Sequence, residues 1–383
     1  MLDWVTGRRK LLALGAVVLL AGCKVIPDGG QPGPLPRPDD GPTEALPDDA
    51  DRHRIALLVP TSGSNAAVGE GIANATTMAL LDTNASNLRI TTYDTATGAE
   101  SAAARAIADG NKLVLGPLLG SDVAAVISQA RRQSVPLITY SNDTSVAQPD
   151  VFVMGHIPDQ SIARTIGYAA RQGHRRFAAL IPNGEYGDRV MAAFRDAVGA
   201  NGGGVVNLQR YDRGNTSIVS AAQRLVATGP FDAVLIAEGV RLSQMAAAEI
   251  RNTATDAQIL GPELWSGESS VASNAALRGA LFSAVSDSRF GRFADSYRSR
   301  FGGQPHRIAT LGYDSVLLTL RIARDWRPGR DFPASQVTDP GGFVGIDGPF
   351  RFLSRGVGQR AMEVRQIGNG SVSVVDPAPE RFD

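Results

Sequence analysis

The chain has 383 residues, of which 43% are hydrophobic, and its 38 basic side chains balance its 38 acidic ones. A formal charge of zero creates no long-range field that would attract nucleic acid, so nucleic acid is not an expected partner. Because one hydrophobic core stops growing at about 250 to 300 residues, this length favours two packed lobes.

The first 22 residues have the pattern of an export signal. Residues 8–10 are basic, and the apolar run at 11–20 is shorter than the roughly 20 residues that cross a bilayer as a helix. The run ends in LAGC, which resembles the lipobox of bacterial lipoproteins, where the cysteine is acylated and becomes the first mature residue. Residues 1–22 are therefore a predicted signal peptide, and the single cysteine, Cys23, is the predicted lipidation site. The alternative is a free cysteine behind a chance hydrophobic start.

Residues 23–52 are predicted to form an acylated, unfolded tether. Seven prolines, four glycines and six aspartates stand among residues 24–51, and such a composition buries too little apolar surface to offset the ordering of the backbone. Lys24 follows the cysteine, and in lipoproteins of this kind a residue other than aspartate usually accompanies sorting to the outer membrane. The resemblance thus implies a body that is lipid-anchored in the outer membrane and faces the periplasm.

Strand and helix patterns alternate from residue 54 onward. RIALLVP at 54–60 is a continuous apolar run bounded by turn residues, typical of a buried parallel strand, and Val68, Ile72 and Leu80 then recur with helical spacing. The alternation continues with predicted strands at 88–93, 112–115 and 135–140 and predicted helices at 99–109 and 121–133. Alternating strands and helices indicate a doubly wound parallel sheet.

A second series of the same kind follows the loop at 141–150. Its predicted strands lie at 151–154, 176–181, 204–210, 232–237, 257–260 and 280–285, and its predicted helices at 159–172, 187–199, 216–228, 241–251, 289–301 and 308–324. The series supports an α/β chain with two Rossmann-like lobes. Glycine turns and alternating residues at 342–352, 361–367 and 371–375 predict a terminal hairpin.

Five stretches in collinear order resemble type I periplasmic binding proteins of the leucine-binding-protein-like group. They are LLVPTSGSNAAVGEGIANATTMAL from residue 57, LVLGPLLGS at 113–121, VPLITYS at 135–141, EYG at 185–187 and GFVGIDGPFRF at 342–352. The resemblance implies two lobes joined by a multi-strand hinge. Lobe I is expected to comprise 53–152 plus 286–327, lobe II 153–285 plus 328–376, and a tail 377–383.

Two branches of this superfamily compete for the function. One comprises solute receptors of ABC importers for branched-chain amino acids, and the other comprises the penicillin-binding protein activators, lipoproteins that stimulate peptidoglycan synthases. Several stretches of this sequence resemble the second branch. They are YDT at 93–95, ADG at 108–110, RQGHRRFAALIPN at 171–183, GDRV at 187–190 and GPELW at 261–265. With the lipobox and the tether, these stretches favour an activator that contacts a bifunctional peptidoglycan synthase. The alternative is a receptor that delivers an amino acid to an importer permease.

Ligands of open α/β sheets lie outside the carboxyl ends of the strands, and here two such edges are expected to face each other. In leucine-binding relatives, amides and hydroxyls of these loops hold the ligand carboxylate and an acidic side chain holds its ammonium. By resemblance, the candidate hydroxyls are those of Ser121, Ser141 and Thr144, Glu263 is the ammonium-binding acid, and Tyr186 closes one wall.

The sequence departs from the receptor pattern at two places. Gly120 stands where a carboxylate-binding serine is expected, and Gly239-Val240 where an aromatic residue is frequent. Each candidate also has a plainer structural interpretation. Ser141 and Thr144 suit a polar turn that caps a helix, Glu263 suits an ion pair with an arginine, and Tyr186 suits a helix start.

No enzyme motif is present in the sequence. The four histidines, His53, His156, His174 and His306, are scattered and none lies in HExxH. The three lysines exclude both Ser-x-x-Lys and a Walker loop, because none has a serine three residues before it and none lies in Gly-Lys-Ser/Thr. We therefore expect a binding protein with no catalytic residue, no metal site and no cofactor.

Overall fold

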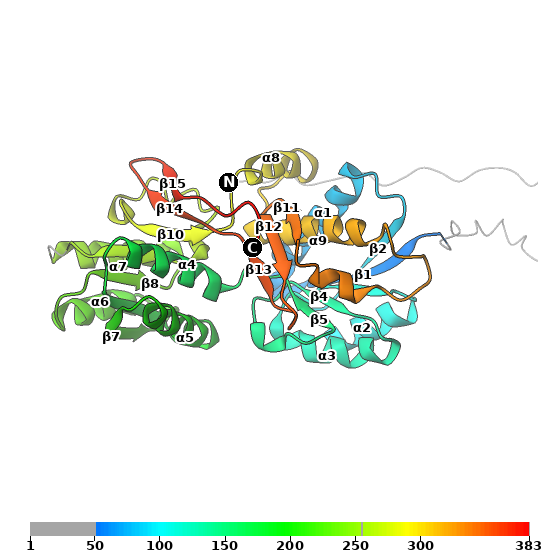
Figure 1. Ribbon diagram of the computed structural model, residues 1–383, viewed down its shortest axis with the longest axis horizontal. Coiled ribbons are helices and arrows are strands. Elements are labelled where there is room, and N and C mark those ends of the chain that lie inside the picture. Colours follow the sequence, from blue (N-terminus) through cyan, green and yellow to red (C-terminus); the bar gives the residue numbers. More distant parts are fainter. Residues whose placement is uncertain (1–50, 254–255, 383) are drawn as a thin grey trace, which may run out of the picture. The chain divides into compact units, whose positions relative to one another are not determined.

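The computed structural model describes residues 51–253 and 256–382. Within these residues the chain forms two α/β lobes, each built on a largely parallel sheet covered by helices (Figure 1). This architecture confirms the predicted fold class. Cys23, the signal peptide and the tether up to residue 50 lie outside the described residues, so lipidation stays a prediction.

Lobe I contains a five-stranded parallel sheet in the order β2-β1-β3-β4-β5. Its strands are β1 (His53–Val59), β2 (Leu88–Asp94), β3 (Leu113–Leu115), β4 (Leu137–Thr139) and β5 (Val151–Val153). Alternate residues of β1 enter opposite cores: Ile55 and Leu57 pack on one face, and Ala56 and Leu58 on the other. A strand that is buried on both faces explains why RIALLVP is apolar without a break.

Helices cover both faces of this sheet. They are α1 (Ala66–Asp82), α2 (Ala99–Ala108), α3 (Gly120–Ala130), α8 (Phe290–Phe301) and α9 (Thr310–Ile322). The core with α1 and α9 lies on one face and the core with α2 and α3 on the other, while α8 packs on α1 through Phe293 and Tyr297 (Figure 1).

Lobe II contains a seven-stranded sheet in the order β15-β14-β10-β9-β8-β6-β7. Its strands are β6 (Arg176–Pro182), β7 (Gly204–Tyr211), β8 (Ala233–Ile236), β9 (Gln258–Gly261), β10 (Leu281–Ala284), β14 (Glu363–Ile367) and β15 (Val372–Asp376). The first five pair in parallel, whereas β14 and β15 add an antiparallel edge. The hairpin of β14 and β15 accounts for the alternating pattern at 361–367 and 371–375.

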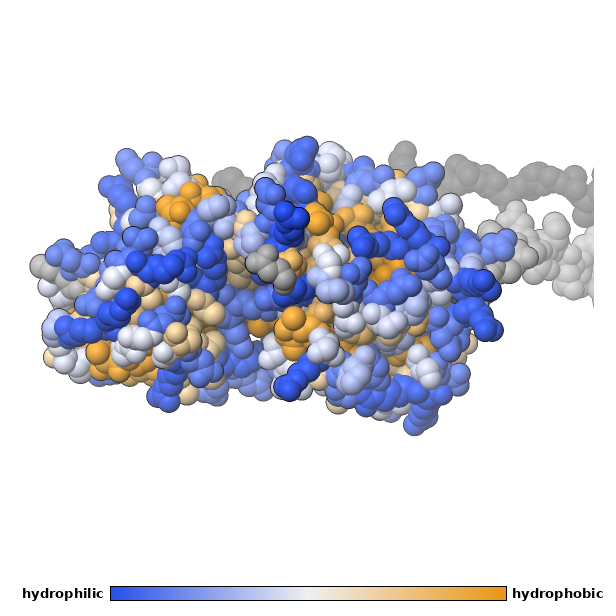
Figure 2. All heavy atoms as spheres, viewed as in Figure 1, coloured by the Kyte–Doolittle hydropathy of each residue, from blue (hydrophilic) through white to orange (hydrophobic). Residues whose placement is uncertain are grey.

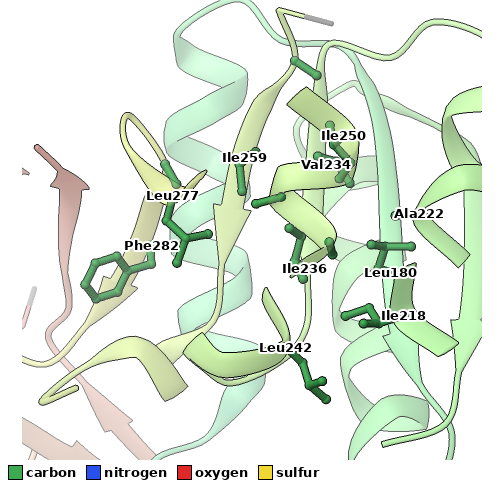
Figure 3. Packing of buried hydrophobic residues seen from close by; sticks show 14 of the residues in the cluster. Leu180, Ile218, Ala222, Val234, Ile236, Leu242, Ile250, Ile259, Leu277 and Phe282 are labelled. Carbon is green, nitrogen blue, oxygen red and sulfur yellow. The ribbon is translucent and has the colours of Figure 1, made fainter. Parts of the chain in front are cut away.

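The helices of lobe II also lie on two faces. They are α4 (Pro158–Arg171), α5 (Glu185–Ala200), α6 (Ser217–Ala227) and α7 (Val240–Asn252). Leu180 and Ile236 point to the core with α6 and α7, which Figure 3 shows from close by, and Ala179 and Leu235 point to the core with α4 and α5. Both cores are mostly aliphatic, with aromatic rings among them such as Phe282 in the first and Phe194 in the second.

The segment from 328 to 360 differs from the sequence-based boundary. Strands β11 (Phe343–Gly345), β12 (Gly348–Phe352) and β13 (Gly358–Arg360) form a separate three-stranded antiparallel sheet. Phe332, Phe343 and Phe350 join the lobe I core with α1 and α9, although this segment was expected in lobe II. The alternating pattern shows which side of a strand is buried, but it does not show which of two cores buries it.

The chain passes between the lobes at three places, after β5, after β10 and after β13. We call these segments, 154–157, 285–289 and 360–363, the hinge. Figure 2 shows hydrophilic residues over most of one face, with small apolar patches between them. No helix within the described residues is long and apolar enough to cross a membrane.

Candidate functional site

A cavity of about 400 Å³ lies between the two lobes, at loops that follow strands β3, β4 and β9. Lobe I and the hinge contribute Leu118, Leu119, Tyr140, Asn142, His156, Arg307 and Ile308. Lobe II contributes Glu263, Leu264, Ser266 and Glu268. A volume at the small end of ligand pockets, with a few polar groups among apolar ones, suits a small polar ligand.

Glu263 is the predicted site residue that lines this cavity. It opens a short 3₁₀ helix, η4 (Glu263–Trp265), directly after β9, and the indole of Trp265 anchors that turn by donating to the carbonyl of Glu238 at 2.8 Å. The Oε2 atom of Glu263 is buried and has no hydrogen-bond partner among the described residues. Burial raises the pKa of Glu263 to about 7, and the charge of Asp159 adds to this rise.

The structure places the three predicted hydroxyls away from the cavity lining. Ser121 is exposed in the first turn of α3, and Thr144 begins the short helix η3 (Thr144–Val146). Ser141 is buried, and its Oγ accepts the amide of Asp143 at 3.0 Å. Asn142, which lies between these positions, lines the cavity instead. The local interpretation of this loop, a polar turn that caps a helix, agrees with these contacts.

Packing explains the glycine at position 120. A Cβ atom at Gly120 would lie 3.0 Å from the Oγ of Ser141 and 3.2 Å from the Cβ of Asp143. A serine would therefore need the neighbouring loop to shift. Asp143, which the sequence did not single out, caps η3 by accepting the amide of Ser145 at 3.0 Å.

Tyr186 lies in the first turn of α5, and its ring packs under the guanidinium of Arg213 at 4.6 Å. Its hydroxyl is buried and has no hydrogen-bond partner in the part of the chain that the structure describes, and the same holds for the Oγ of Ser266. Burial raises the pKa of Tyr186 well above its usual value, and the negative charge of Glu263 contributes to the rise. Tyr186, Ser266 and Glu263 therefore give lobe II three unsatisfied buried polar atoms, and buried polar groups normally have partners.

One ion pair links the two lobes beside the cavity. The Nη1 atom of Arg189 in α5 lies 3.5 Å from the Oδ1 of Asp143 in lobe I. Nearby, the carboxylate of Glu238 accepts the hydroxyl of Tyr211 at 3.1 Å and the Nε of Arg213 at 2.9 Å. Glu238 is thus already satisfied by the protein, whereas Glu263 is not.

A buried charged cluster lies where the hinge meets the cavity, and the sequence did not reveal it. Asp347, at 0% exposure, accepts from Arg307, from Thr310 at 2.9 Å and from the ring of His156 at 2.7 Å. The Nη1 of Arg360 lies 3.6 Å from Asp347. Arg307 and its neighbours hold the pKa of Asp347 far below its usual value against the opposing effect of burial.

Asp314 is the second buried carboxyl of the cluster. It accepts the amides of Ile346 at 2.6 Å and Asp347 at 3.4 Å. Burial and the charge of Asp347 raise the pKa of Asp314. Among the described residues, Asp347 accepts from the guanidinium of Arg307 and Asp314 accepts from backbone amides, so the pKa values of the two carboxyls are shifted in opposite directions. Within residues 51–253 and 256–382, no group of three or more acidic, His or Cys side chains could hold a metal ion.

A family model described as periplasmic binding protein matches residues 53–371. The match spans both lobes, and the chain belongs to this family. The two lobes with their parallel sheets have the leucine-binding-protein-like type I form of the fold.

Two solved structures and one curated sequence illustrate the similarity. The leucine binding protein LivK of Thermotoga maritima superposes with a TM-score of 0.63 at 21% identity, over 84% of this chain and 97% of that one. The branched-chain amino acid binding protein LivJ of Streptococcus pneumoniae, solved with isoleucine, gives 0.64 at 20% identity, over 85% and 100%. Likeness at these identities establishes the fold alone.

The curated sequence is the uncharacterized protein RP748 of Rickettsia prowazekii. It is 27% identical over 173 residues, which are 45% of this chain and 46% of that protein. The chain therefore spans about half the length of this relative.

Proposed function

We propose that the chain is a solute-binding receptor that holds a small zwitterion between its lobes. The first candidates are branched-chain amino acids, which the receptor would deliver to the permease of an ABC importer. The observation that carries this proposal is the half-buried, cavity-lining Glu263, whose Oε2 is buried without a partner among the described residues and whose pKa is raised to about 7. The ammonium group of a ligand would supply the positive partner that the Oε2 of Glu263 lacks among the described residues.

The apolar part of the cavity supports the same ligand class. Leu118, Leu119, Leu264 and Ile308 surround the polar groups, and Leu119 and Leu264 are 39% and 37% exposed, on opposite lobes. A branched aliphatic side chain between them would be removed from water as the lobes approach each other. The receptor recognises its ligand in this proposal and does not transform it.

The comparisons support the receptor better than the activator that the sequence resemblance favoured. The solved relatives named above are a leucine binding protein and a branched-chain amino acid transporter substrate binding protein in complex with isoleucine. A synthase partner therefore has only the sequence resemblance in its favour. The lipid anchor at Cys23 and the outer-membrane location are likewise proposals from the sequence.

The test is calorimetric titration of the full chain with each standard L-amino acid. We expect micromolar or tighter binding of at least one branched-chain amino acid. Glu263→Gln should weaken that binding by about thirtyfold or more, because a hydrogen bond between charged partners is lost in a buried site. Glu268→Gln is the matched control, since Glu268 lines the same cavity but is exposed, and we expect less than about threefold change.

Two results would overturn the receptor proposal. One is the absence of binding for every amino acid in the panel. The other is equal weakening by Glu263→Gln and Glu268→Gln, which would remove the special role of the buried carboxyl. A chain that binds no amino acid but raises glycan polymerisation by a purified bifunctional synthase would support the activator instead.

A further inference from the structure

Arg307 joins the cavity to the hinge. It begins the short helix η6 (Arg307–Ala309) ahead of α9, lines the cavity and is 11% exposed. Its side chain meets lobe II as well, because a Cβ atom added at Gly267 would lie 3.4 Å from the Cδ of Arg307. The aliphatic part of the Arg307 side chain therefore lies beside lobe II, while its guanidinium bonds to lobe I and the hinge.

Most donors of this guanidinium are already used. Nη1 donates to Asp347 and lies 3.3 Å from the hydroxyl of Thr310, and Nη2 donates to the carbonyl of Ser286 at 3.3 Å. The aromatic ring of Phe290 covers one face at 4.3 Å. The Nε atom is buried and has no acceptor among the described residues. The guanidinium is thus held in one orientation, and its Nε–H is left without an acceptor among the described residues.

The charge of Arg307 is only partly neutralised. Asp347 is shared with Arg360 at 3.6 Å, and Asp287, 3.5 Å from Arg307, also pairs with Arg365. Of the described residues that line the cavity, Arg307 alone is a permanent cation, and His156 is kept neutral because burial lowers its pKa. A ligand with an anionic group therefore finds its complement at Arg307.

We propose that Arg307 binds the carboxylate of the ligand through its free Nε–H, while Glu263 binds the ammonium, so that one zwitterion connects the two lobes. This inference rests on the proposed receptor function and deepens it. It assigns to a side chain of lobe I the role that the resemblance gave to the hydroxyls of Ser121, Ser141 and Thr144, none of which lines the cavity.

The preorganised guanidinium makes this assignment physically reasonable. A donor that Asp347, Thr310 and Ser286 already hold in place loses little conformational entropy when the ligand arrives. The free donor also belongs to a charged group, and hydrogen bonds of that kind are stronger than neutral ones. The expected ligand is therefore a zwitterion. An acid without an ammonium group would pair only with Arg307, and an amine without a carboxylate would pair only with Glu263.

The experiment compares L-leucine with L-leucinol, which lacks the carboxylate, by calorimetry on the full chain. Arg307→Lys keeps a charge next to Asp347 but removes the Nε–H donor. We expect it to weaken L-leucine by about tenfold or more and L-leucinol by less than about threefold. Arg321→Lys is the matched control, because Arg321 in α9 is 56% exposed and pairs with Asp339 away from the cavity lining, and it should leave both affinities unchanged.

Equal effects of Arg307→Lys on the two ligands would overturn the assignment. So would a loss confined to L-leucine in Ser141→Ala, since that would place the carboxylate at the loop after β4. If Arg307→Lys melts too early to be titrated, the double variant Arg307→Gln with Asp347→Asn removes both charges together. Its loss of affinity for L-leucine is then compared with its loss of affinity for L-leucinol in the same way. A wild-type chain that binds neither compound nor any other amino acid would instead overturn the receptor function itself.

Discussion

Glu263 illustrates what a carboxyl with one buried oxygen requires of its surroundings. No cation among the described residues pairs with its Oε2, and desolvation raises its pKa to about 7. Its position after β9 could be predicted from the sequence, because an acid there must lie at the carboxyl edge of the sheet. The roles of Ser141 and Tyr186 could not, because they depend on hydrogen bonds and on ring packing that the order of residues does not encode.

In the proposed receptor, the pKa of about 7 of Glu263 should make ligand binding depend on pH. Below that pH the free protein holds a proton on Glu263, and an ammonium must displace it, so affinity should fall by up to about tenfold per pH unit. Above it, the carboxylate is already charged and the affinity should level off. Calorimetry with L-leucine between about pH 5 and pH 8 measures this profile. Glu263→Gln should bind weakly with a flat profile, and an unchanged slope in that variant would assign the titration to another group.

Two helices begin in the same way, although they belong to different lobes. Gly69 in α1 and Gly187 in α5 each lie against the end of the preceding strand, where an added Cβ would be 1.8 Å from the oxygen of Pro60 and 1.7 Å from that of Pro182. Each glycine therefore lets its helix pack directly on its sheet, as in other nucleotide-fold units. Most helices and strands could be predicted within a residue or two because their periods are strong, but these close approaches could not.

Gly187→Ala should lower the free energy of unfolding by about 1 to 3 kcal/mol, because the new methyl group overlaps backbone. Gly199→Ala is the matched control in the same helix, since nothing lies within 4 Å of its Cβ position. That change should be neutral or stabilise the protein by about 0.5 to 1 kcal/mol. Chemical denaturation of both variants measures the difference, and similar stabilities would contradict the close packing at α5.

At the scale of the whole molecule, the hinge cluster joins segments that are far apart in the sequence. Asp347 follows β11, His156 precedes α4 and Arg360 ends β13, yet all three meet in one buried site. The two-lobed fold could be predicted from the order of strands and helices. The assignment of β11–β13 to lobe I and the charged cluster could not, because both depend on which distant surfaces pack together.

The two buried carboxyls of the charged cluster should respond differently to amidation. Asp347→Asn leaves Arg307 and Arg360 without their shared anion, and should lower the free energy of unfolding at neutral pH by about 3 to 5 kcal/mol. Asp314→Asn should change it by less than about 1 kcal/mol, because the amide oxygen can still accept the amide of Ile346.

The pH dependence of these variants follows from the direction of each shift. The lowered pKa of Asp347 means that its contribution is present above pH 3.8 and is lost in acid. The raised pKa of Asp314 means that stability falls as pH rises above 3.8. Asp314→Asn should therefore gain stability relative to the wild type as pH rises, which thermal melting across pH measures. A loss of stability of Asp314→Asn relative to the wild type as the pH rises would contradict the raised pKa of Asp314.

The crystal structure of the full chain with L-leucine tests the central claim most directly. We expect the ligand in the cavity between the lobes, with its ammonium at hydrogen-bond distance from Glu263 and its side chain against Leu119 and Leu264. An empty cavity at saturating L-leucine, or a ligand bound outside the cleft, would contradict the receptor function.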